Sequence, residues 1–207
     1  MMPDHGKRAD GYPRSSVQLK AATVIALVSL AIALAATACG ESDHESHARS
    51  LYNAYRIAED ARTDAEEELR QAFADISEAA QSQDREAVLA AALRGQKAVE
   101  KIDGLLSAEL EAAQGLAEID SVATHAKQLS HGLEQSRSSL ALVGEELQIA
   151  LDDPFLETRK KEVDDLAKES AELAAKGEIA VRRADRALAL ALGLEPRIDQ
   201  IFGTTTG

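Results

Sequence analysis

Residues 50–80 read SLYNAYRIAEDARTDAEEELRQAFADISEAA, and this stretch decides the fold. Its apolar residues recur at steps of three and four, so they lie along one face of an α-helix. Acidic residues are frequent at the other positions, and one charged residue, Arg62, interrupts the apolar stripe. Such a stripe needs neighbouring helices to cover it. Its members are Leu51, Tyr55, Ala58, Ala65, Leu69, Ala72, Ile76 and Ala79.

The same period recurs three more times along the chain. It predicts four helices of similar length, over about 50–81, 84–115, 120–151 and 154–192. Matched lengths and short connections favour an all-α, antiparallel four-helix bundle with coiled-coil-like packing over residues 50–193. Alanine-rich stripes let helix axes approach closely, so we expect a slender bundle without a roomy cavity.

Capping residues place the boundaries between these helices. Asp84 suits the N-cap of the second helix, and Asp152-Asp153-Pro154 supplies an acidic cap before a proline at the first helical position of the fourth. Gly115 and Asp120 predict a turn after the second helix, although the change of phase there also fits one long helix over 84–151. Gly193 ends the last helix, and residues 194–207 form a short tail in which Ile198, Ile201 and Phe202 can dock back.

The overall charge excludes some classes of partner. The chain has a formal charge of −13, and residues 1–38 contribute +2, so the remainder carries −15. A field of this sign disfavours binding to nucleic acid or to anionic lipid. Only 3% of residues are aromatic, which leaves few platforms for stacking sugars or bases.

Residues 1–38 have the organisation of a secretory signal peptide. A start of net positive charge precedes the uncharged residues 21–38, which end in Ala36-Thr37-Ala38. An uncleaved membrane helix is an alternative, because eighteen uncharged residues are near the lower limit for spanning a bilayer. A second alternative is an ordinary secretory signal peptide that is cleaved after Ala38.

The segment Ala36-Thr37-Ala38-Cys39-Gly40 resembles the lipobox of bacterial lipoprotein precursors. The resemblance implies that the sulfur of Cys39 carries a diacylglyceryl group and that the chain is cut just before it. The family usually has leucine where Ala36 stands. The protein is then expected at the cell membrane, lipid-anchored and facing away from the cytoplasm.

Residues 39–49 are small, polar and charged, so we expect a lipidated flexible tether. His44 and His47 lie there beside carboxylates and are weak candidates for metal ligands, since imidazole suits divalent transition ions. A tether without a rigid frame must order its own ligands at a cost of about 1–2 kcal/mol per residue. The sequence therefore favours a tether over a metal site.

The sequence offers no nucleophile paired with a base and no glycine-rich phosphate loop. We expect a non-enzymatic interaction or scaffolding module without a cofactor, whose partner is an envelope or extracellular protein or a second copy of the chain. The alternative is a lipoprotein that binds a small ligand or a metal.

The candidate contact surface is the tip remote from the membrane, with Phe155 beside Asp84, Asp152 and Asp153. Arg182 and Arg186, one helical turn apart, either pair with acidic neighbours or hold an anion.

Overall fold

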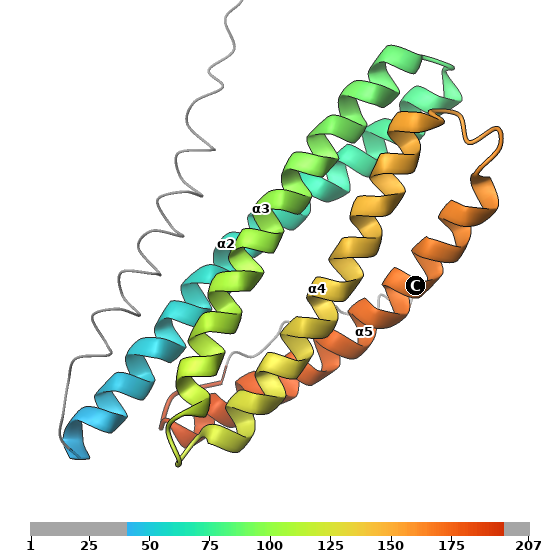
Figure 1. Ribbon diagram of the computed structural model, residues 1–207. Helices are drawn as coiled ribbons and strands as arrows, with labels where there is room; N and C mark the ends of the chain where they lie inside the picture. The colour runs from blue at the N-terminus through green and yellow to red at the C-terminus, as the bar shows by residue number, and fades with distance from the viewer. Residues whose placement is uncertain (1–40, 197–207) are drawn as a thin grey trace, which may run out of the picture.

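The computed structural model describes residues 41–196, which contain four α-helices and no β-strand. Successive helices run in opposite directions, so the described residues form an antiparallel bundle, as predicted (Figure 1). The N-terminus of α2 and the C-terminus of α5 lie at the same end as the α3–α4 turn. The helices are α2 (Glu41–Gln81), α3 (Arg85–Ala117), α4 (Ala123–Asp152) and α5 (Lys160–Ala191).

The backbones of successive helices lie close together: α2 packs on α3, α3 on α4, and α4 on α5. At the end shared by their termini, α2 and α5 are joined by side chains. There the Nε of Arg49 donates a hydrogen bond of 3.2 Å to the carbonyl of Leu192, which neutralises part of the negative end of the α5 dipole. Further along the bundle, the α2–α5 side is more open.

Two predicted helix ends are confirmed in detail. The carboxylate of Asp84 accepts a hydrogen bond of 3.0 Å from the N–H of Ala87 and caps α3. At the end of α5, Gly193 has φ +67°, and the N–H of Leu194 donates to the carbonyl of Ala189 at 2.8 Å. This is the Schellman arrangement that glycine favours, because it has no Cβ to clash.

The alternative of a single helix over 84–151 is wrong, because a turn separates α3 from α4. Two details of the predicted turn also need correction. The helix α3 continues past Gly115 to Ala117, and α4 begins at Ala123 with Val122, not Asp120, as its N-cap. Val122 is almost fully buried in the core and has no capping side chain, so apolar burial outweighs capping here.

The predicted start of the fourth helix at Pro154 is wrong. The helix α5 begins at Lys160, and residues 153–159 form a loop. The carboxylate of Asp153 accepts hydrogen bonds from the N–H groups of Glu157, Thr158 and Arg159, at 3.1, 2.9 and 3.3 Å. It therefore satisfies the donors of the loop instead of those of a helix starting at Pro154.

The expected flexible tether is also wrong over residues 41–49, which are the first turns of α2. Ala48 is buried in the core next to Leu51, so apolar contact continues toward the N-terminus beyond the stripe seen in the sequence. The helix thus begins two positions after Cys39, which itself lies outside the described residues.

The large core side chains gather in the half of the bundle that holds the N-terminus of α2. Alanine predominates in the other half of α2 and at the start of α3. In α5 the buried residues lie from Ser170 onward. The fully buried large side chains are Leu51, Tyr55, Val88, Leu105, Leu106, Glu109, Leu116, Leu129, Leu133, Leu147 and Leu188.

Two glycines bring α4 and α5 into close contact. A Cβ added at Gly177 would lie 2.9 Å from the carbonyl oxygen of Gly132 and 3.0 Å from the amide nitrogen of Ser136. Because both atoms belong to the backbone, a side chain at Gly177 would force the helices apart.

We predict that Gly177→Ala lowers the free energy of unfolding by about 1–2 kcal/mol, since overpacking outweighs the gain in helix propensity. The matched control is Gly144→Ala, where the added Cβ would lie 3.7 Å from a methyl of Val99, an ordinary van der Waals contact. Urea denaturation should show that this control is neutral or stabilising. Equal effects of the two substitutions would contradict the close α4–α5 contact.

Candidate binding groove between α2 and α5

A groove of about 1360 Å³ lies between α2 and α5 and reaches the interior of the bundle. The expectation that the bundle lacks a roomy cavity is therefore wrong. Small residues bring successive helices together, but the residues of α2 and α5 that face each other here are long and charged. The groove is lined by parts of all four helices and by Glu195 and Pro196, the last described residues.

The floor of the groove is mainly apolar. It is made of Leu69, Ile102, Leu106, Leu140, Val143 and Val181. Two hydroxyls also lie there, but each is engaged with a backbone carbonyl. Ser136 donates to Gly132 at 3.2 Å, and Ser139 donates to Ser170 at 2.8 Å. The floor therefore offers carbon surface to an occupant.

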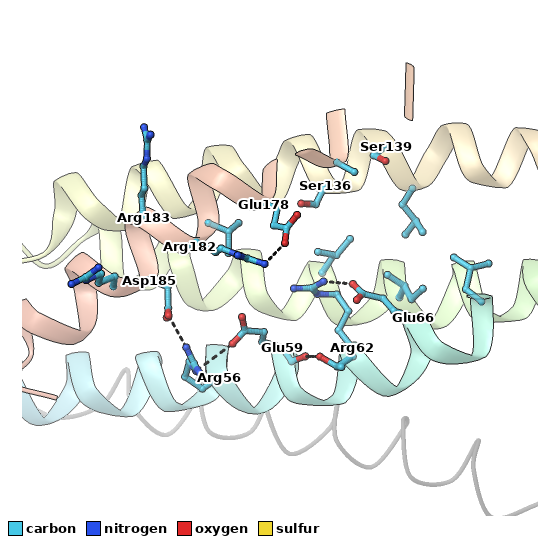
Figure 2. Close-up of a pocket in the computed structure, with 18 of the residues that line it drawn as sticks. Arg56, Glu59, Arg62, Glu66, Ser136, Ser139, Glu178, Arg182, Arg183 and Asp185 are labelled. Carbon is cyan, nitrogen blue, oxygen red and sulfur yellow. Dashed lines mark hydrogen bonds and ion pairs between the residues drawn. The ribbon is translucent and has the colours of Figure 1, made fainter. Parts of the chain in front are cut away.

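Charged side chains of α2 form one wall (Figure 2). Arg56 reaches across to α5, where its Nη1 lies 2.7 Å from Oδ2 of Asp185. The hydroxyl of Tyr52 donates to the other oxygen of Asp185, also at 2.7 Å. Burial and this hydrogen bond raise the pKa of Tyr52 well above its usual value, so it remains a donor. These contacts connect α2 to α5 at one end of the groove.

Three arginines of α5 lie on the opposite wall. Arg182 forms an ion pair with Glu178, as Figure 2 shows. Arg183 and Arg186 are exposed and form no ion pair with another described residue. The groove lining as a whole holds five arginines and five acidic residues, so it is locally balanced in charge although the chain is strongly acidic.

A buried ion pair lies behind the α2 wall. The side chain of Glu109, on α3, is 0% exposed, and its Oε1 lies 2.6 Å from Nε of Arg62. Arg62 also pairs with Glu66 on its own helix. Burial raises the pKa of Glu109 to about 7, although the Arg62 guanidinium acts in the opposite direction. The break that Arg62 makes in the stripe was visible in the sequence, but its partner was not.

The weak metal candidates lie in the first turns of α2. His44 is exposed and His47 is partly buried, with an Nδ1 that has no hydrogen-bond partner. Within residues 41–196 no group of three or more His, Cys, Asp or Glu side chains is placed to hold a metal ion. The other helices thus add no further ligands to these two residues.

The candidate contact residues lie at the end of the bundle with the α2–α3 turn and the α4–α5 loop. Phe155 is 38% exposed there. Each of the three aspartates has a local role: Asp84 caps α3, Asp153 binds loop amides, and Asp152 lies 3.5 Å from Arg159. The role of this tip as a contact surface stays a prediction.

None of the described helices has a stretch long and apolar enough to cross a bilayer.

Comparison with models of known families, with curated proteins and with solved structures gives no match to this chain.

The raised pKa of Glu109 predicts a specific dependence of stability on pH. A carboxyl whose pKa rises on folding stabilises the folded state fully below about pH 4.5, and this contribution is lost as pH rises through about 7. We therefore compare the free energy of unfolding of Glu109→Gln with that of the unchanged chain. The variant should be about 2 kcal/mol more stable, relative to the unchanged chain, at pH 8 than at pH 5.5.

Urea denaturation at the two pH values measures this gain. The control is Glu111→Gln, a substitution at an exposed residue of the same helix. Its free energy of unfolding should differ from that of the unchanged chain by a similar amount at both pH values. The same difference at both pH values for Glu109→Gln would show that burial does not favour its neutral form.

Proposed function

We propose that the protein is a non-enzymatic lipoprotein of the bacterial envelope, held at the cell membrane through Cys39, that acts by binding a partner in the α2–α5 groove. The groove is the observation that carries this proposal. An apolar floor between charged walls is the arrangement by which helical proteins receive a segment with one apolar face.

The dimensions favour a protein segment over a compact small molecule. Pockets for small ligands measure about 300–1,000 Å³ and enclose most of the ligand. At about 1360 Å³, this groove exceeds that range and lies along two helices. An interaction module is thus favoured, and a small-ligand lipoprotein remains the alternative. A metal-binding lipoprotein is less favoured, since among the described residues no further ligand joins His44 and His47.

The chemistry of the groove supports a binding role rather than catalysis. Among the described lining residues, the hydroxyls of Ser136 and Ser139 donate to backbone carbonyls, and Glu66, Glu178 and Asp185 pair with arginines. A catalytic nucleophile would instead be activated by an adjacent base.

We predict that the N-terminal peptide of the unchanged protein begins at Cys39 with a diacylglyceryl group on its sulfur, and that Cys39→Ser carries no such group at any position. Fractionation and mass spectrometry of the N-terminal peptide measure the outcome. An unchanged protein that stays in the membrane with residues 1–38 attached and Cys39 unmodified would show that an uncleaved helix is the anchor instead.

Photo-crosslinking in intact cells tests the groove as the binding surface. A photoreactive amino acid replacing Val143, on the groove floor, should give a discrete adduct with a partner protein. The same replacement at Leu93, which is 51% exposed on α3 and does not line the groove, should give none. The photoreactive amino acid is also placed at Phe155, and an adduct formed only from that position would show that the contact surface is the tip. The absence of an adduct from all three positions would refute a protein partner at these surfaces.

A further inference from the structure

The described chain ends at the border of the groove. The Schellman arrangement at Gly193 ends α5 and turns the chain away from the helix axis. Leu194 then packs against the core, and Glu195 and Pro196 line the groove. The described chain therefore reaches the groove at Pro196, the residue that precedes the segment 197–207.

The segment that follows has the composition of an occupant. Residues 197–202 read RIDQIF, with Ile198, Ile201 and Phe202 at positions i, i+3 and i+4. As a helix, in which this spacing puts the three apolar side chains on one face, six residues span about 9 Å, and when extended they reach about 20 Å. Along α2, the lining residues run from Arg56 to Leu69, which corresponds to about 20 Å of helical rise. The segment is long enough to bring its apolar side chains to the floor.

The segment carries one charge of each sign, Arg197 and Asp199, and Asp199 is the one that suits the arginines of the groove. Arg183 and Arg186 line the groove without an ion pair to another described residue. Asp199 follows Pro196 by three positions, so an extended chain carries it about 10 Å beyond Pro196, which lines the groove. An aspartate–arginine pair at the mouth would fix the direction in which the segment enters.

We propose that residues 197–202 occupy the α2–α5 groove in the free protein and that a partner must displace them to bind. The inference rests on the proposed function, because it concerns how that same groove is regulated. A resident segment keeps the apolar floor from water and lowers the apparent affinity of every competitor by the fraction of time it is bound. Only a partner that buries more apolar surface then gains access.

Thiol reactivity of the groove floor tests this proposal. Val143→Cys is made in the purified full chain and in a chain that stops at Pro196, and the rate of maleimide modification is compared. We expect modification at least tenfold faster without residues 197–207. Phe202→Asp in the full chain should give a similar increase, because a carboxylate is expelled from the apolar floor.

Two controls accompany the comparison. Leu93→Cys, outside the groove, should react equally fast with and without the tail. The parent chains correct for reaction at Cys39, and far-ultraviolet circular dichroism checks that each variant remains helical.

The outcomes separate this inference from the proposed function. Fast modification of Val143→Cys in both chains would overturn occupancy by the tail and leave the groove open to a partner. Slow modification in both would overturn occupancy by the tail and also the accessible groove on which the proposed function depends.

Discussion

Arg62, a charged residue in the apolar stripe of α2, is the constraint on which the shape of this bundle depends. Its guanidinium lies 2.6 Å from the fully buried Glu109 and also pairs with Glu66. Removing these charges from water is costly, so they are retained only with close partners. We attribute the spacing of α2 and α5 to this cluster, because it fills the position where an apolar side chain would draw the two helices together.

The contrast with α4 and α5 supports this view. Gly132 and Gly177 let those helices approach until their backbones are almost in contact. On the α2–α5 side, long arginine and glutamate side chains take the place of small residues, and Arg56 spans the distance to Asp185. Asymmetry among the four interfaces therefore produces a groove in a bundle whose stripes look alike in sequence. That groove is the surface on which we base a binding role.

Much of the fold was predictable from the period of the apolar residues, because burial of one helix face imposes that period directly. The helix ends were predictable where one residue decides them, as at Asp84 and Gly193. They were not predictable where tertiary contacts decide. Ala48 extends α2 because it is buried, and Asp153 binds loop amides rather than the start of a helix.

The groove could not be predicted, for a related physical reason. A stripe shows which face of a helix is buried, but it does not show which neighbour covers the face or how closely. The interruption at Arg62 and the arginines at 182, 183 and 186 were each visible in the sequence. Their arrangement around one groove, and the partner of Arg62 on α3, depend on the three-dimensional packing of four helices.

The distance between α2 and α5 tests the central claim most directly. Spin labels at Thr63 and Ala174, which line opposite walls, report this distance by pulsed electron paramagnetic resonance. In the variant with Arg62→Leu and Glu109→Leu, apolar side chains replace the buried pair at little or no cost in stability. Our account predicts a shorter distance with a narrower distribution in this variant. An unchanged distance would contradict the claim that the buried ion pair holds the groove open.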